Sequence, residues 1–392
     1  MTTMHRETVA GGPGAFMTVD HLTVSGSQAA IGRRLAEEAR SRYGWRPVPA
    51  DPVVSRARRA WFERNWPQHY ARMAGAAQAM GVDLRDDLVH LDALSGVPDG
   101  SGCSATWSAP SATVEGRALL GRNYDFFTVG WRQLFALLGG ETPPAHETPM
   151  AARPYVITSR PDDGPATTVI TMSDLDGCTE GINEHGLAVV LLLADTESTS
   201  GSPVDAGPQV GLSSMQLPRF VLDTCENVEQ AKQALLGAKQ YDLGIPLHYL
   251  IADRTGRAFV WEHSNGGVDH IIEADGEALC VTNHPLHRPI DPANPPRDNA
   301  ETMLTYQRHE HLREQVKDGP MSAARLREVL DEVRFDARKA DALPVRTLWR
   351  TVFDLDELTM AAHFYLGDAP DGDLVYSPEV TFSPVVQRHR VG

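Results

Sequence analysis

The chain has 392 residues, of which 42% are hydrophobic and 22% charged, a balance typical of a globular protein with a sizeable core and room for one large domain or two ordinary ones. Asp and Glu number 52 against 36 Lys and Arg, so the formal net charge is −16. Such a surface repels nucleic-acid phosphates and anionic lipids, so we expect no nucleic-acid or membrane partner, although a locally basic pocket is compatible with this average.

Helical spacing of apolar residues covers most of the first hundred residues. It predicts helices over residues 28–43 and about 53–80, and an aspartate N-cap predicts a short third helix over residues 84–94. The composition then changes abruptly, because residues 97–102 hold two glycines, a proline, an aspartate and a serine, which indicates an exposed loop. The sequence thus predicts a helical N-terminal segment that ends with this loop.

After the loop, the chain becomes rich in strand patterns. Residues 103–107 and 118–122 flank a turn near residues 115–116 and are predicted to form a hairpin whose first residue is Cys103. Further strands are predicted at residues 155–159, 168–172, 187–193, 248–252, 258–262, 271–273, 347–353, 359–365 and 375–382, and helices at about residues 214–224, 228–236 and 299–317. Strands in blocks separated by helices indicate an α+β protein rather than a regular βαβ alternation.

The cysteines indicate a reducing compartment. Cys103, Cys178, Cys225 and Cys280 are far apart and include no Cys-x-x-Cys pair, which fits neither a disulfide framework nor a zinc finger. Residues 1–24 lack the apolar region of a signal peptide, and no apolar run approaches the length of a membrane span. We therefore expect a cytoplasmic protein.

Cys103 stands directly after a glycine, at the boundary between the helical and the strand-rich parts. Its thiol can attack the preceding carbonyl and convert the amide to a thioester, which water then hydrolyses. Gly102 helps because the absence of a Cβ lets the chain adopt the geometry of that attack. Cleavage leaves Cys103 with a thiol and an α-amine of ordinary pKa about 8, a suitable general base. A small buried residue at the start of a strand is the ordinary alternative.

Five segments in order resemble one superfamily. GCSAT at residues 102–106 with LLGRNYDFF at 119–127, MAGAAQAMGV at 73–82, EGINEHGLAV at 180–189, CVTNHP at 280–285 and TLWRTVFDLDELTMAAHFYLGD at 347–368 carry the resemblance. They resemble the N-terminal-nucleophile (Ntn) hydrolases that include isopenicillin-N acyltransferase (acyl-coenzyme A:6-aminopenicillanic acid acyltransferase), the choloylglycine hydrolases and acid ceramidase. The long N-terminal segment is similar to the acyltransferase branch.

The resemblance implies a fold, a division of the chain and an activity. The fold would be a four-layer αββα sandwich, with residues 1–102 as a helical segment and residues 103–392 as the catalytic core, which stay together as an alpha/beta heterodimer after self-cleavage. The activity would be hydrolysis or exchange of the acyl group of a small N-acyl amide. A cysteine amidase that uses a histidine base without self-cleavage, and an inactive ligand-binding descendant of the fold, are the alternatives.

The resemblance also implies a role for five side chains. Cys103 would be the nucleophile and, through its amine, the base, and Asp125 would hold that amine. Arg122 would favour the thiolate and position the substrate. Asn283 would donate a side-chain N–H to the oxyanion, and Arg308 would assist electrostatically. Without the resemblance, these residues also fit a turn aspartate, a strand arginine, an asparagine before a proline and a solvated helix face.

Three positions depart from the family pattern. Bile salt hydrolases place an asparagine where this chain has Leu193, which puts bile-acid amidase activity in doubt and favours a buried strand or an apolar acyl wall. Near Arg308, the family usually has a serine and a second arginine, whereas this chain has Thr305 and His311.

Two other features are expected to be structural or inert. Cys178 also follows a glycine, but cleavage there would leave Arg122 and Asp125 on the other fragment, so we interpret it as structural. His284 and His287 fit no standard zinc spacing, and we expect no metal. No cofactor is implied, although a coenzyme A thioester is compatible as co-substrate.

Overall fold

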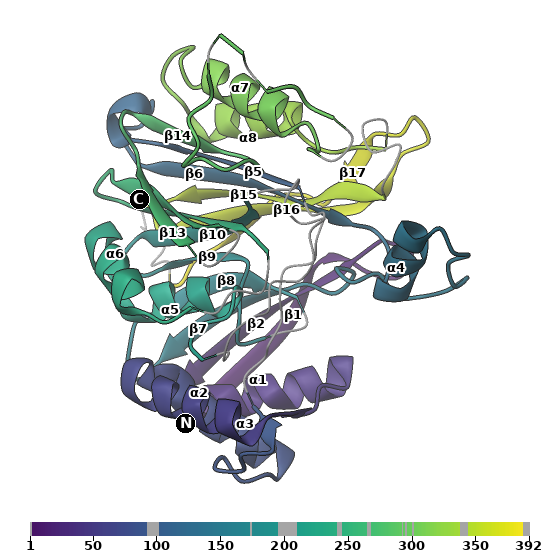
Figure 1. Ribbon diagram of the computed structural model, residues 1–392, viewed down its shortest axis with the longest axis vertical. Helices are drawn as coiled ribbons and strands as arrows, with labels where there is room; N and C mark the ends of the chain where they lie inside the picture. The colour runs from purple at the N-terminus through teal and green to yellow at the C-terminus, as the bar shows by residue number, and fades with distance from the viewer. Residues whose placement is uncertain are drawn as a thin grey trace, which may run out of the picture.

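The computed structural model describes residues 2–91, 102–172, 175–194, 210–240, 245–264, 268–291, 293–294, 296–299, 302–337 and 344–386. Figure 1 shows four layers, in which two β-sheets are stacked face to face and helices cover the outer face of each. None of the helices among these residues is long and apolar enough to cross a membrane.

The larger sheet has nine strands. Their order across the sheet is β1 (Thr3–Gly11), β2 (Thr18–Gly26), β7 (Tyr155–Pro161), β8 (Thr167–Thr171), β9 (Glu180–Asn183), β10 (Leu187–Leu193), β11 (Leu247–Asp253), β12 (Ala258–Ser264) and β13 (Val268–Glu273). Neighbours are antiparallel except β2 and β7, which run parallel. Every residue of β10 is buried, as expected for a strand covered on both faces.

The smaller sheet carries Cys103. Its order is β14 (Ala278–Val281), β5 (Cys103–Ser108), β6 (Leu119–Phe127), β15 (Val345–Asp354), β16 (Thr359–Asp368) and β17 (Leu374–Tyr376), and β18 (Val380–Phe382) also pairs with β16. All residues of β5 and β6 are buried. In the antiparallel β5–β6 pair, Cys103 lies opposite Tyr124.

Helices form the two outer layers. α1 (Gln28–Tyr43), α2 (Pro52–Asn65), α3 (Pro67–Met80), α5 (Gln216–Thr224) and α6 (Val228–Gly237) lie on the nine-stranded sheet, and α7 (Thr305–Gln315) and α8 (Ala323–Glu332) lie on the other. α4 (Trp131–Gly139) projects from one side, and a 3₁₀ turn (Pro110–Ala112) and a two-stranded pair, β3 (Val48–Pro49) with β4 (Val89–His90), complete the elements.

Three apolar clusters fill the spaces between these layers. One lies between the sheets and includes Cys103 and Trp107 of β5, the second lies under α1–α3, α5 and α6, and the third lies under α7 and α8. Because successive strand residues point to opposite faces, Cys103 faces the other sheet, whereas Ser104 faces the α7–α8 layer. The cysteine thus begins its strand at the interface of the two sheets.

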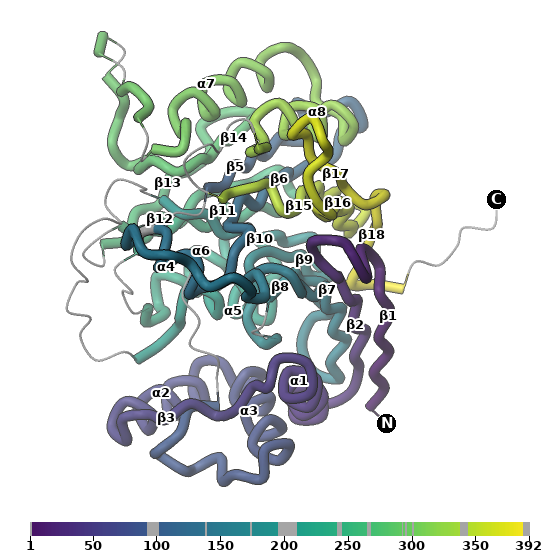
Figure 2. Tube along the Cα trace, turned by 90° about the vertical axis from the view of Figure 1, so that its right-hand side faces the viewer, coloured from purple at the N-terminus to yellow at the C-terminus, as the bar shows by residue number. Residues whose placement is uncertain are grey.

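The prediction that the N-terminal segment is helical is wrong for residues 3–26. β1 and β2 form a hairpin there and extend the nine-stranded sheet. Leu22 and Val24 of β2 are buried and alternate with polar residues, a period-two pattern that favours a strand. Figure 2 shows α1, α2 and α3 gathered on the outer side of this sheet. The segment before Cys103 therefore contributes two strands as well as its helices.

Two other helix predictions need correction. The predicted helix at residues 53–80 is two helices, α2 and α3, because Pro67 lacks an N–H and excludes helical backbone at the residue before it. The helix at residues 84–94 is wrong up to residue 91, since the carboxylates of Asp83 and Asp86 accept hydrogen bonds from backbone N–H groups two residues on and form turns. Its remainder, with most of the predicted loop, lies outside the described residues.

The other predictions are largely confirmed. The helix at residues 28–43, the hairpin that begins with Cys103, the α5–α6 pair and the later strands are present, except that the strand predicted at residues 375–382 is two short strands, β17 and β18. α7 begins at Thr305 rather than near residue 299, and the sequence patterns did not predict α4, α8, β9 or β14.

Candidate active site

Cys103 is almost fully buried, with an exposed fraction of 2%. Its Sγ lies 3.4 Å from Nη2 of Arg122, which projects from β6 toward the same interface. Burial raises the pKa of the Cys103 thiol, and the positive charge of Arg122 opposes that rise. Arg122 also donates to the carbonyl of Leu191 and forms an ion pair with Glu180 of β9. The thiol therefore contacts the guanidinium of Arg122, which groups of the facing sheet hold in place.

The peptide group between Gly102 and Cys103 is held on both sides. The carbonyl oxygen of Gly102 accepts a hydrogen bond from the backbone N–H of Asp125 at 3.0 Å. The N–H of Cys103 donates to Oδ1 of Asn283 at 2.9 Å, and its carbonyl accepts from Arg308 at 2.7 Å. A Cβ on Gly102 would lie 3.0 Å from Cε of Met303. Lack of space, rather than a left-handed backbone, therefore favours glycine here.

Asp125 is fully buried, and only one of its two carboxylate oxygens accepts a hydrogen bond from the described residues. Its Oδ1 accepts a hydrogen bond from the hydroxyl of Thr347. Its Oδ2 has no hydrogen-bond partner among the described residues and lies 3.6 Å from Nη1 of Arg308. Burial raises the pKa of Asp125 to about 6, against the lowering effect of Arg308 and Thr347. Asp125 and Arg122 are three positions apart and thus point to opposite faces of β6, so they approach Cys103 from opposite sides.

Asn283 presents its amide oxygen to Cys103. Two donors, the N–H of Cys103 and Nη2 of Arg308, bind Oδ1 and fix the orientation of the amide. Nδ2 donates to the carbonyl of Leu193 at 2.8 Å, and the backbone N–H donates to the hydroxyl of Thr305 at 2.7 Å. An oxyanion role would use the second N–H of Nδ2. Thr305, a departure from the family pattern, thus supports Asn283.

Arg308 of α7 points inward, with 5% of its surface exposed, so the alternative of a solvated helix face is wrong for it. Its three nitrogens donate to the carbonyls of Met303 and Cys103 and to Asn283. His311, three residues on, instead pairs with Glu332 in an exposed position. The five predicted site residues thus meet around one peptide bond.

Glu180 was not predicted from the sequence as a residue of the site. This buried carboxylate pairs with Arg122 and accepts hydrogen bonds from Nε1 of Trp349 at 3.0 Å and Oγ1 of Thr351 at 2.6 Å. It opens the EGINEHGLAV segment, and a charged residue at the start of a buried strand was the available signal. Thr347, which binds Asp125, opens the last family-like segment and was also missed.

Cys178 and Leu193 belong to the apolar cluster on the other side of the nine-stranded sheet, so both side chains point away from Cys103. The interpretation of the apolar residues that end with Leu193 as a buried strand is confirmed. The four cysteines, all within the described residues, form no disulfide. No histidine within that part of the chain forms a hydrogen bond with Sγ of Cys103.

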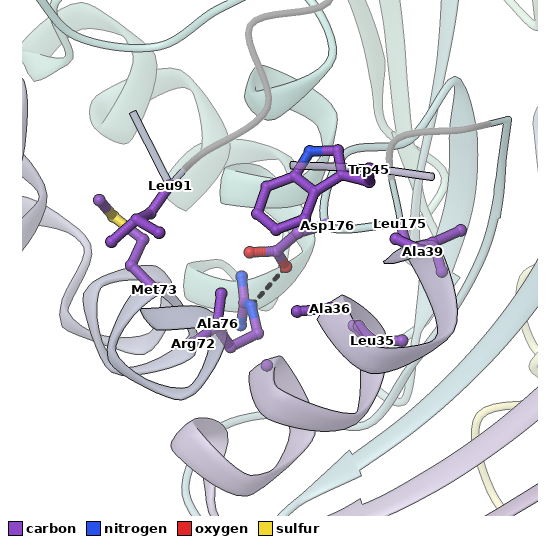
Figure 3. Close-up of a pocket in the computed structure, with 11 residues that line it drawn as sticks. Leu35, Ala36, Ala39, Trp45, Arg72, Met73, Ala76, Leu91, Leu175 and Asp176 are labelled. Atoms are coloured by element: carbon purple, nitrogen blue, oxygen red, sulfur yellow. Dashed lines mark hydrogen bonds and ion pairs between the residues drawn. The ribbon is translucent and has the colours of Figure 1, made fainter. Parts of the chain in front are cut away.

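A separate pocket lies between α1 and α3, on the outer side of the nine-stranded sheet (Figure 3). Apolar side chains, among them Leu35 and Met73, surround the ion pair of Arg72 and Asp176 there. Since Cys103 faces the other side of this sheet, the pocket is not part of its site.

Two stacked sheets between helical layers, with a buried cysteine that opens a strand beside an arginine and an aspartate, define an α+β sandwich of the Ntn-hydrolase class. Residues 112–368, more than half of the chain, match the model of the acyl-coenzyme A:6-aminopenicillanic acid acyl-transferase family, and the chain belongs to this family. The family resemblance read from the sequence is thereby confirmed. The match begins after Cys103.

No curated protein matches the chain in sequence. Among solved structures, it is similar to penicillin V acylase from Agrobacterium tumefaciens, with 16% identity over 70% of this chain and 85% of that one and a TM-score of 0.43. A variant of the conjugated bile acid hydrolase from Clostridium perfringens has 14% identity, coverage of 73% and 100%, and a TM-score of 0.46. The N-acylethanolamine-hydrolyzing acid amidase ortholog from Caenorhabditis elegans has 13%, coverage of 64% and 93%, and a TM-score of 0.41.

Proposed function

We propose that this protein is a self-activating cysteine amidase or acyltransferase. It would cleave its own Gly102–Cys103 bond and then hydrolyse or exchange the acyl group of a small N-acyl amide through a thioester on Cys103. The observation that carries the proposal is the peptide group held between the backbone N–H of Asp125 and the side chain of Asn283, beside an Arg122–thiol contact.

Self-cleavage begins with attack of Sγ of Cys103 on the carbonyl carbon of Gly102. The thiol loses its proton, negative charge develops on the carbonyl oxygen, and the N–H of Asp125 stabilises that charge. Collapse breaks the C–N bond and the nitrogen of Cys103 takes up the proton as an amine. Water then hydrolyses the Gly102 thioester, which gives a carboxylate on Gly102 and restores the thiol.

The new amine needs a partner, and Asp125 offers one. Its buried Oδ2 lacks a hydrogen bond in the intact chain, and a buried carboxylate without donors is costly. An ammonium at Cys103 would bind it as a charge-assisted pair and return its pKa toward the ordinary range. Held there, the amine can take the thiol proton and later deliver it to the leaving amine.

Turnover would repeat the same chemistry on a substrate. The thiolate, stabilised by Arg122, attacks the acyl carbonyl, and the second N–H of Nδ2 of Asn283 stabilises the oxyanion. The amine leaves with a proton from Cys103, and an acyl thioester remains. Water gives hydrolysis, and a second amine or thiol gives exchange; the family description names acyl transfer, so a coenzyme A thioester stays a candidate co-substrate.

Two structural facts bear on the alternatives and the partners. A histidine-assisted amidase would need a histidine at the thiol, and the described histidines make no such contact; burial moreover lowers the pKa of His284 to about 3.

The segments before and after Cys103 would remain together as a heterodimer, because β2 pairs with β7 within one sheet. We propose residues 1–102 and 103–392 as the two chains.

The test is to trap the acyl-enzyme. A panel of N-acyl amides with aliphatic and aromatic acyl groups is mixed with the protein, quenched in acid and examined by intact mass. An acyl increment on the fragment that begins with Cys103, absent from Cys103→Ala and removed by hydroxylamine, supports the proposal. Turnover without any such adduct, retained in Cys103→Ala, would contradict it.

A further inference from the structure

Three side chains suited to metal binding meet at the edge where the two sheets face each other. Glu262 comes from β12, His270 from β13, and His287 from the turn after β14. One ligand atom from each lies within 4.8 Å of the other two. Glu262 is buried and the histidines are half-buried, so the cluster is not an ordinary patch of exposed acidic groups.

The strand register brings these ligands together. Glu262 and His270 are directly opposite in the antiparallel β12–β13 ladder, so their side chains share one face. His287 stacks on His270 with ring centroids 4.0 Å apart and planes 1° apart, and its Nδ1 contacts Oε1 of Glu262. The register and this contact place one oxygen of Glu262 and one nitrogen of each histidine close together, within reach of a single ion.

An outer shell orients the carboxylate. Oε2 of Glu262 accepts hydrogen bonds from Nε2 of His248 at 2.7 Å and the backbone N–H of Leu286 at 2.6 Å, so Oε1 remains on the side of His287. Hydrogen bonds of this kind hold metal-binding side chains in place in known sites.

We propose that Glu262, His270 and His287 bind a divalent transition-metal ion, with zinc the best fit. Two imidazole nitrogens and one carboxylate oxygen are a usual zinc donor set, and water would complete a four-coordinate sphere. The ion would join the edge of the nine-stranded sheet to the turn that follows the other sheet. This inference is independent of the proposed function.

The ion would also support the candidate active site indirectly. Nδ1 of His248 lies 3.1 Å from the carbonyl of Thr282, the residue before Asn283. A metal on Glu262 would hold this His248 contact and the turn at residues 282–286 in one arrangement. Its role would thus be to position Asn283 rather than to take part in the reaction.

The proposal revises the expectation that the chain holds no metal. That expectation considered His284 and His287 and standard spacings within one segment. The structure separates these two histidines, because Nδ1 of His284 faces the hydroxyls of Thr282 and Thr305. The ligands here come from three segments, and such a set has no sequence spacing to recognise.

The test is a zinc titration of the chelator-treated full chain, carried out in the Cys103→Ala background so that the site thiol and self-cleavage play no part. We expect one Zn²⁺ per chain by calorimetry. His270→Ala and His287→Ala should each weaken binding at least tenfold, whereas His263→Ala, on the opposite face of β12, should match the parent. Co²⁺ should give the visible absorption of a four-coordinate site, lost in His270→Ala.

Absence of stoichiometric binding at micromolar Zn²⁺, or unchanged affinity in both ligand variants, would overturn the proposal. Circular dichroism without metal establishes that each variant is folded. His270 lies half-buried on an edge strand, so its variant decides the matter if His287→Ala does not fold. Since turnover is not measured, failure of the metal site and failure of the proposed activity are distinguishable.

Discussion

Two buried aspartates differ in how completely their oxygens are used. Asp223 of α5 accepts hydrogen bonds from Nε of Arg219 at 3.0 Å, Nη2 of Arg72 at 2.6 Å and Nε1 of Trp66 at 3.2 Å. Asp125 accepts from Thr347 alone, and its second oxygen lacks a hydrogen-bond donor among the described residues. Both side chains are almost fully buried, so the contrast does not come from exposure to water.

We interpret the difference as a structural role for Asp223 and, under the proposed function, a chemical role for Asp125. Arg72 of α3 binds Asp223, Asp176 and the side-chain oxygen of Gln28 with its three nitrogens (Figure 3 shows the pair with Asp176). This network joins the N-terminal helices to the rest of the fold. It occupies both carboxylate oxygens of Asp223, so neither is open to a new partner. Asp125 has one oxygen open beside the peptide bond that we propose is cut. We infer that this oxygen binds the new α-amine of Cys103 in the processed chain.

Arg72→Met should have the largest effect on stability. The change removes one of the two arginines that bind buried Asp223 and the arginine that binds half-buried Asp176, and it should lower the free energy of unfolding by about 3 kcal/mol, measured by urea denaturation. Arg56→Met removes an arginine whose surface pair with Asp87 is exposed to water, and its midpoint should stay nearly unchanged. Equal losses in the two variants would contradict the structural role that we assign to the Arg72–Asp223 network.

Asp125→Asn should reduce turnover about 10²–10³-fold, since the amine of Cys103 would lose its charged partner. The processed variant should remain folded, because the asparagine oxygen can still accept the bond from Thr347, although it loses the ion pair with the ammonium. Asp223→Asn is the matched control and should show reduced stability with unchanged turnover per folded molecule. A stable, fully active Asp125→Asn enzyme would show that the open oxygen has no role in the reaction.

The pH dependence of stability should change with processing. In the intact chain, burial raises the pKa of Asp125 to about 6, whereas an unfolded aspartate titrates near pH ~4. The folded state thus binds a proton that the unfolded state releases, and the unfolding free energy should fall by up to about 3 kcal/mol as pH rises from about 4 to 6. Cys103→Ala, compared with Cys103→Ala/Asp125→Asn, isolates this loss.

In the processed enzyme the sign should reverse. An ammonium beside the carboxylate lowers the pKa of Asp125, so stability should rise or stay level across the same pH interval. The measurement is denaturant unfolding of the wild type and the Asp125→Asn variant, both fully processed, at pH 4 to 7. The same downward slope before and after processing would contradict a pairing of Asp125 with the new amine.

Gly102→Ala should have the smallest effect. Its Cβ would press on Cε of Met303 at 3.0 Å and Cε2 of Phe335 at 3.3 Å, and the flexible methionine can move. We expect a stability loss of about 1 kcal/mol and self-cleavage slowed about tenfold, since a small shift of the carbonyl disturbs the attack. A time course by gel electrophoresis measures the rate. A Gly102→Ala variant that stays uncleaved with normal stability would show that cleavage requires glycine for a reason other than the space around its Cα.

The sequence predicted which side chains gather around Cys103 better than it predicted the surrounding fold. Cys103, Arg122 and Asp125 lie on one hairpin, so local strand pattern and motif were enough to bring them together. Asn283 and Arg308 were placed through the resemblance, and the structure brings both to the same peptide. The orientation of the Asn283 amide depends on two donors from other segments, so the sequence around residue 283 could not predict it.

The misses share a physical cause. The hairpin β1–β2 was overlooked because most of β1 is exposed, so only β2 carries a buried alternation. Glu180 was missed because its partner Arg122 lies on the facing sheet, and a buried ion pair between sheets leaves no periodic signal. The Glu262 cluster depends likewise on cross-strand register. Contacts between strands, rather than the propensity of any one segment, decided each of these features.

The most direct measurement is the intact mass, under denaturing conditions, of freshly purified wild type beside Cys103→Ala. We predict fragments of residues 1–102 and 103–392 in the wild type and a single full-length mass in the variant. A wild-type chain that keeps its full-length mass on prolonged incubation while it hydrolyses N-acyl amides would contradict self-activation at Cys103.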